Sequence, residues 1–221
     1  FGQWIILMYF YSEFISEKRK FFFKNFAIIL SVTIHFYFTM MLIIILFLEK
    51  IYDLILQKIS LKLFFSEIIM IILPILFLMY ILGYFSIGLS DGLGWGYGHY
   101  NLNLNSFINP LGRTTQDIDW SNFLPTQKFQ NGEIEGFSYL GLSGLIFLIL
   151  FFKFFFIKNS KIVFEKKKVL LISVIFFVIA ISNNLNFGNT NLIEIELNKY
   201  IYAMSSLVRA SGRFIWPIFY L

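Results

Sequence analysis

The stretch that decides the fold is residues 25–48, NFAIILSVTIHFYFTMMLIIILFL, which carries no charged side chain over 24 residues. A helix of about 20 residues is long enough to cross the hydrocarbon core of a bilayer. Three further windows also lack Asp, Glu, Lys and Arg, at 68–90, 136–152 and 169–193. Because irregular backbone cannot face lipid, each window is expected to be helical. The sequence therefore predicts an all-α polytopic transmembrane helical bundle, with four complete spans and a partial span at each end.

Composition also indicates that lipid is the solvent of this chain. Hydrophobic residues make up 58% of the 221 residues and charged residues 14%, whereas a soluble domain carries about 25% charged residues. A soluble enzyme and a disordered chain are therefore excluded. The net charge of +5 comes mainly from lysines beside apolar runs, which indicates membrane topology, so nucleic acid is not an expected partner. The chain has no cysteine, which excludes disulfides and thiolate metal sites.

Charge in the connecting segments predicts an orientation and a division of the chain. The segment 153–168 holds six lysines and is expected to be cytoplasmic. The segment 83–137 then becomes a long extracytoplasmic loop region, between transmembrane helices in 1–82 and in 138–221. The latter part would include an outer loop at about 188–213. Both chain ends lie in apolar runs, so the sequence is expected to be a fragment of a longer chain.

Residues 88–110, GLSDGLGWGYGHYNLNLNSFINP, form the first candidate site. Its glycines permit tight turns, and its NLNLN run alternates as an extended strand does, which would place the amides on one face. Amides and aromatic rings are the usual groups that bind sugars. Asp91, His99, Asn101 and Asn103 are therefore candidate substrate-binding residues. The alternative is a loop that covers the membrane surface, with its Trp and Tyr rings at the interface.

Four acidic residues provide further candidates: Asp117, Asp119, Glu133 and Glu135. The two aspartates form a DxD pattern that can hold a divalent cation beside phosphates. Solvated surface acids give the same pattern, so no metal ligand and no cofactor is assigned. Glu135 borders an apolar window, where a partly desolvated carboxylate can serve as a general base. It is the candidate catalytic residue, and the alternative is a helix-end charge among lipid headgroups.

The third candidate is VRASGRFIWP, residues 208–217. Arg209 and Arg213 are four residues apart, so an α-helix would place both on one face. Two guanidinium groups on one face make a clamp for a phosphate or diphosphate. The alternative is a pair of arginines that snorkel at the start of a helix.

Five motifs in order resemble an uncharacterised bacterial family of polytopic membrane proteins that is similar to GT-C glycosyltransferases. They are GYFSIG, GWGYGHYNLNLNSFINP, WSNFLP, GEIEGFSYLGLSGL and VRASGRFIWPIFYL. The resemblance implies a multi-pass protein of the bacterial inner (cytoplasmic) membrane. It also implies inverting sugar transfer from a polyprenyl-phosphate-linked donor at the extracytoplasmic face.

The resemblance makes the lipid bilayer and a lipid-linked sugar donor the expected partners. Arg209 and Arg213 are the positions that match a lipid-phosphate clamp. The resemblance assigns no catalytic base, because that acid usually lies in a first external loop nearer the N-terminus. A non-enzymatic transporter or flippase of lipid-linked glycans remains open, as does a structural envelope protein.

Overall fold

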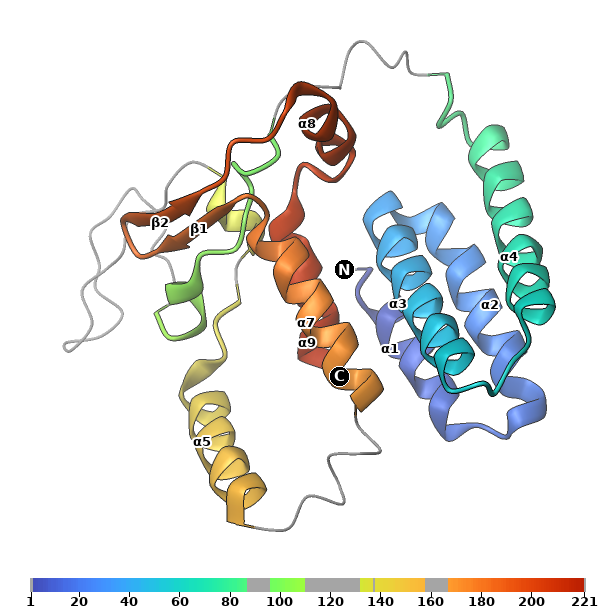
Figure 1. Cartoon of the computed structure of the whole chain (residues 1–221), viewed down its shortest axis with the longest axis horizontal. Coiled ribbons are helices and arrows are strands. Elements are labelled where there is room, and N and C mark those ends of the chain that lie inside the picture. The colour runs from blue at the N-terminus through green and yellow to red at the C-terminus, as the bar shows by residue number, and fades with distance from the viewer. Residues whose placement is uncertain (1, 87–95, 110–131, 137, 158–166, 221) are drawn as a thin grey trace. The chain divides into compact units, whose positions relative to one another are not determined.

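Figure 1 shows the computed structural model, which is helical over most of its described length. The structure describes residues 2–86, 96–109, 132–136, 138–157 and 167–220. The chain divides into two compact units. Unit 1 comprises Phe1–Asp91 together with Phe219–Leu221, and unit 2 comprises Gly92–Ile218.

Unit 1 is helical, and its core lies among the first three helices. Its helices are α1 (Trp4–Tyr11), α2 (Glu17–Ile34), α3 (Phe36–Ile55) and α4 (Leu61–Ile81). Helix α2 packs against α1, α3 and α4. Fully buried apolar side chains from the first three helices fill the core: Ile5, Ile6, Ile28, Met41, Leu42 and Ile45. Each such side chain contributes about 1.5–3 kcal/mol through its removal from water.

The window 25–48 forms a helical hairpin, so the prediction of one span there is wrong. Helix α2 ends at Ile34, and α3 begins at Phe36. Between them, His35 has extended backbone, and its Nδ1 accepts a hydrogen bond from the N–H of Tyr37 at 3.2 Å. A continuous helix over this window would be about 36 Å long. Instead, Lys24 Nζ lies 2.5 Å from Glu49 Oε2, so the two charges that bound the window meet.

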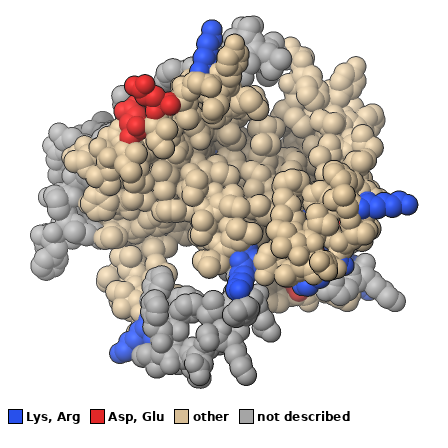
Figure 2. Space-filling model, in the orientation of Figure 1, with Lys and Arg blue, Asp and Glu red and all other residues tan. Residues whose placement is uncertain are grey.

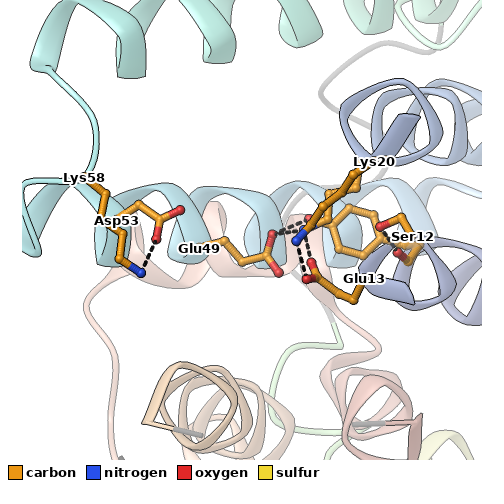
Figure 3. Close-up of polar contacts among 8 residues, drawn as sticks. Ser12, Glu13, Lys20, Glu49, Asp53 and Lys58 are labelled. Atoms are coloured by element: carbon orange, nitrogen blue, oxygen red, sulfur yellow. Dashed lines mark hydrogen bonds and ion pairs between the residues drawn. The ribbon is translucent and has the colours of Figure 1, made fainter. Parts of the chain in front are cut away.

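These two charges belong to a partly buried network of ion pairs in unit 1 (Figure 3). Lys24 Nζ also lies 2.5 Å from a carboxylate oxygen of Glu13, and Lys20 Nζ lies 2.6 Å from the other oxygen. The hydroxyl of Tyr9 donates to Glu49 at 2.9 Å. The side chains of Lys24 and Glu49 are only 10% and 8% exposed. Mutual pairing is therefore what allows these charges to lie in an apolar unit.

Unit 2 combines helices with a short β-hairpin (Figure 1). Its longer helices are α5 (Gly141–Ile157) and α7 (Lys167–Ile181), and α8 (Lys199–Ser205) is short. The short α9 (Trp216–Tyr220) begins in unit 2, and its last two residues are assigned to unit 1. The hairpin consists of antiparallel β1 (Asn184–Phe187) and β2 (Thr190–Glu194). Short 3-10 helices lie in the connecting segments, namely η2 (Leu104–Phe107), η3 (Glu133–Gly136), η4 (Ser206–Val208) and η5 (Ser211–Ile215). Helix α7 packs against η5, and η3 packs against η5.

The hairpin occupies the second half of the window 169–193, where a transmembrane helix was predicted. Helix α7 ends at Ile181, and Ser182 has a positive φ of 62°. The NNLNFGNTN run that follows is rich in residues that favour turns over helices. Gly188, with φ 61°, begins the two-residue turn between the strands. The absence of charge in this window therefore reflects asparagine and glycine as well as apolar residues.

The prediction of four complete spans is wrong as a whole. Helix α4, of 21 residues, is the one helix within the described ranges that is long and apolar enough to cross a membrane. Helix α5 has 17 residues, or about 25 Å of length, and α7 has 15. At the chain ends, α1 has eight residues and α9 has five. The fold is a mostly helical chain with one candidate span and a two-stranded sheet.

Asn198 caps the start of α8, because its Oδ1 accepts hydrogen bonds from the N–H groups of Tyr200 and Ile201, both at 3.0 Å. Asn198→Ala should destabilise this helix by about 1 kcal/mol. Hydrogen–deuterium exchange should become faster at 199–205. Asn191→Ala is the matched control, since that exposed amide caps no helix. Unchanged exchange in Asn198→Ala would contradict the capping role.

Candidate functional site

Three segments far apart in the sequence meet in unit 2. The N–H of Leu102 donates to the carbonyl of Ala180 at the end of α7, at 2.9 Å. The N–H of Gly212 in η5 donates to the carbonyl of Tyr100 at 2.8 Å. Asn103 forms an isolated parallel bridge with Asn186 in β1. The NLNLN run is thus held between the hairpin and η5.

Two glycines allow this close approach. A Cβ on Gly136 would lie 2.6 Å from the carbonyl oxygen of Asn101. A Cβ on Gly212 would lie 2.7 Å from Cα of Gly136 and 3.0 Å from the carbonyl carbon of Asn101. The backbones of the three segments therefore touch where only glycine fits. This contact joins the GWGYGHYNLNLN, GEIEG and VRASGR motifs at one place.

A buried group of amides surrounds a carboxylate beside this contact, and it is called the asparagine cluster here. Its members are Asn101, Asn103, Asn184, Asn186 and Glu133. Glu133 is 1% exposed, and its Oε1 accepts hydrogen bonds from Asn103 Nδ2 at 2.9 Å and Asn186 Nδ2 at 3.3 Å. These amide donors stabilise a charge that burial alone would disfavour. Glu133 was one of four acidic candidates for which solvated surface acids were the alternative, and its burial excludes that alternative for this residue.

The amides also connect the cluster to the hairpin. Asn103 Nδ2 donates to the carbonyl of Gly188 at 2.8 Å, and Asn103 Oδ1 accepts from the N–H of Gly188 at 3.0 Å. Asn101 Nδ2 donates to the carbonyl of Asn184 at 2.6 Å. Asn101 and Asn103 are fully buried, as is Leu102 between them. The extended segment is therefore covered on both faces rather than showing its amides to solvent.

Several acceptors around the cluster are buried without a hydrogen-bond partner in the part of the chain that the structure describes. They are Oδ1 of Asn183, Asn184 and Asn186, and the hydroxyls of Ser182 and Ser211. Ser211 is fully buried, and Asn186 is 6% exposed. Unsatisfied buried acceptors are uncommon, because each costs about 1–3 kcal/mol. The cluster therefore has unused capacity for a molecule that carries hydroxyl or N–H donors.

Glu135 and Arg213 form a two-pronged ion pair next to the cluster, on η3 and η5. Arg213 Nε lies 2.6 Å from Glu135 Oε2, and Nη2 lies 2.8 Å from Oε1. Both side chains are half-buried, with 24% exposure for Arg213 and 31% for Glu135. The guanidinium carbon lies 5.9 Å from the centre of the Trp216 ring. The predicted base and half of the predicted clamp are therefore bound to each other.

Arg209 does not share a helix face with Arg213, so that part of the prediction is wrong. Ala210 lies between η4 and η5 with φ −88° and ψ 60°, which interrupts the helical path. Arg209 is exposed, and its Cβ packs near Gly96. No hydrogen bond or ion pair joins its side chain to another described residue. The two arginines thus belong to one segment but not to one helical face.

The remaining candidates lie in different surroundings. His99 is half-buried, and its ring meets the edge of the Tyr100 ring at 4.9 Å. Asp91, Asp117 and Asp119 lie outside the described residues. Within the described ranges, His, Asp and Glu do not gather in groups of three that could hold a metal ion. Asn184 and Asn186 were missed by sequence reasoning, although the NNLNFGN run was their signal.

Comparison with known proteins gives one match. Neither the curated proteins nor the solved structures include one that is significantly similar to the chain. A family described as a domain of unknown function, DUF6311, matches residues 1–221. The chain therefore belongs to the DUF6311 family.

Proposed function

We propose that the chain is a glycosyltransferase-like membrane protein that binds the sugar of a polyprenyl-phosphate-linked donor at the asparagine cluster. The observation that carries this proposal is the set of buried acceptors without partners beside the cluster. Sugar hydroxyls donate to amide oxygens and accept from amide N–H groups, so an asparagine-rich site suits them. The Glu135–Arg213 ion pair also supports the proposal. Glu133 of the cluster and Glu135 both lie on η3, so the ion pair is held next to the proposed sugar site.

The chemistry proposed for this site is an inverting transfer. A hydroxyl of the acceptor attacks the anomeric carbon of the sugar and gives its proton to Glu135. The bond between that carbon and the phosphate oxygen breaks, and the polyprenyl phosphate leaves with the electron pair. Arg213 stabilises the charge on the leaving phosphate.

A membrane location in the bacterial cytoplasmic membrane is part of the proposal, and α4 supports it. The helix has 21 residues, or about 31 Å, which matches a hydrocarbon core of about 30 Å. Large apolar side chains along it are exposed, including Leu73, Phe77 and Tyr80 at 60%, 64% and 74%. Figure 2 shows a face of the molecule with few charged side chains. Apolar surface of this extent requires cover, and lipid would provide it for a protein whose donor carries a polyprenyl chain.

The second candidate is a carrier that binds lipid-linked glycans without chemistry, such as a transporter or flippase. One observation favours it. Both carboxylate oxygens of Glu135 accept hydrogen bonds from Arg213, so the proposed base is occupied in this structure.

Ser211→Ala tests binding sharply, because it removes a buried hydroxyl that has no partner among the described residues. The stability of the folded chain should not fall, because no hydrogen bond within the described residues is lost. The affinity for polyprenyl-phosphate glucose should fall about two- to tenfold for one lost hydrogen bond. The measurement is equilibrium binding to the full chain in nanodiscs. Ser12→Ala is the matched control, since that buried serine lies in unit 1 and donates to the nearby carbonyl of Tyr9.

Two outcomes would decide the proposal. If the chain binds the lipid-linked sugar no better than polyprenyl phosphate without sugar, the site does not recognise sugar. Turnover of labelled donor in native membranes separates the two candidates. Glu135→Gln should abolish donor consumption in an enzyme and keep donor binding, whereas a carrier would consume no donor even as wild type.

A further inference from the structure

In the Glu135–Arg213 ion pair, the carboxylate binds the same edge of the guanidinium group that could bind a phosphate. A carboxylate and a phosphate both present two oxygens to the Nε and Nη2 donors of a guanidinium. In this structure those two donors bind Glu135, at 2.6 and 2.8 Å. A phosphate that arrived at this edge would therefore compete directly with Glu135.

The surroundings allow such an exchange. The exposed fractions of 24% and 31% show that solvent reaches both partners. Solvent screens a partly exposed ion pair, so an incoming anion can compete with Glu135 for Arg213. Arg213 itself is well anchored, because the N–H of neighbouring Gly212 donates to the carbonyl of Tyr100 at 2.8 Å and the Trp216 ring lies against the guanidinium. The carboxylate is then the partner that moves.

Local charge favours an anion at this position. Glu135 neutralises Arg213, and the exposed Arg209 adds a positive charge on the same segment. The buried Glu133 is already surrounded by amide donors from Asn103 and Asn186. A singly charged phosphodiester would therefore meet a segment with positive charge available.

We propose that the Glu135–Arg213 pair is the resting state of an anion site, in which the phosphodiester of the lipid-linked donor replaces Glu135 on Arg213. The released carboxylate then becomes available to accept the proton of the attacking hydroxyl. Donor binding thereby activates the base, and Glu135 stays neutralised when donor is absent. This inference rests on the proposed function, since it takes the donor as the anion.

The direction in which one substitution changes the affinity for the donor tests the exchange. If Glu135 competes with the donor, Glu135→Gln should tighten binding of polyprenyl-phosphate glucose to the full chain by about two- to fivefold. If Glu135 merely holds Arg213 in place, the same substitution should weaken binding. Arg213→Lys should weaken binding in both cases, because lysine lacks the two-pronged geometry. Glu194→Gln on the exposed strand β2 controls for the change in net charge and should have no effect.

A second measurement follows donor binding in the wild-type protein and uses the variant Arg213→Lys only to assign a resonance. The ¹⁵Nε resonance of Arg213, assigned by its loss in Arg213→Lys, should shift when polyprenyl-phosphate glucose saturates the chain. Saturable binding without that shift, or weaker binding in Glu135→Gln, overturns the exchange and leaves the proposed function standing. No binding of the donor by the wild type overturns the proposed function and the exchange together.

Discussion

Gly212→Ala is expected to disrupt the region around the asparagine cluster. Its Cβ would lie 2.7 Å from Cα and 2.8 Å from N of Gly136, and 3.0 Å from the carbonyl carbon of Asn101. All three are backbone atoms, so no side-chain rotation relieves the contact. Overpacking costs about 1–3 kcal/mol, and we expect the upper end because two segments of backbone must move. Hydrogen–deuterium exchange at 96–109 and 132–136 should become much faster.

The matched control is Gly144→Ala in α5, which also adds one methyl group. Its Cβ would lie 3.1 Å from Cβ of Leu140, near the exposed start of the helix. Alanine is better than glycine in a helix by about 1 kcal/mol, which offsets the close contact. We expect the control to change stability little. If hydrogen–deuterium exchange in Gly212→Ala stayed at wild-type rates, the contact of Gly212 with Gly136 and Asn101 would have room for a methyl group, which contradicts the structure.

Apolar windows predicted where helices lie, but not where they end. The charges of Lys24 and Glu49 were interpreted as the borders of one span, because charges rarely enter lipid. In the fold they pair with each other, and His35 is the point where the chain reverses. A window without charge records composition, whereas the length of a helix depends on local backbone choices. The reversal at His35 is accompanied by the tertiary pairing of Lys24 with Glu49, and a window analysis contains neither feature.

The candidate site shows a similar division between what the sequence can and cannot predict. The three motifs that suggested chemistry do lie together in unit 2, as the contacts of Asn101 with Gly136 and Gly212 show. Local periodicity suggested that the asparagine amides share one face, but it could not show that the hairpin covers them. Glu133 and Glu135 look alike in sequence, yet one is buried among amides and the other pairs with Arg213. Which partner each acid takes depends on residues that lie 30 to 78 positions away in the sequence.

Lys24→Met is expected to cause the largest loss of stability in unit 1. Lys24 Nζ lies 2.5 Å from carboxylate oxygens of both Glu13 and Glu49. Without it, Glu13 keeps Lys20, and Glu49 keeps the hydrogen bond from the hydroxyl of Tyr9. Glu49 has a side chain that is 8% exposed, so its charge would stay buried while losing the ammonium group that lies 2.5 Å away. Breaking such a pair costs about 3–5 kcal/mol, measured here as the free energy of unfolding in detergent.

The double variant Lys24→Met with Glu49→Leu isolates the cause. Replacing both members of a buried ion pair by apolar side chains is often neutral or stabilising, because no unpaired charge remains. The double variant should therefore be more stable than Lys24→Met alone, and close to the wild type. A double-mutant cycle with Glu49→Leu then gives the coupling energy of the pair. If Lys24→Met loses less than about 1 kcal/mol, the pair behaves like an exposed one, and the hairpin of α2 and α3 depends on its apolar core instead.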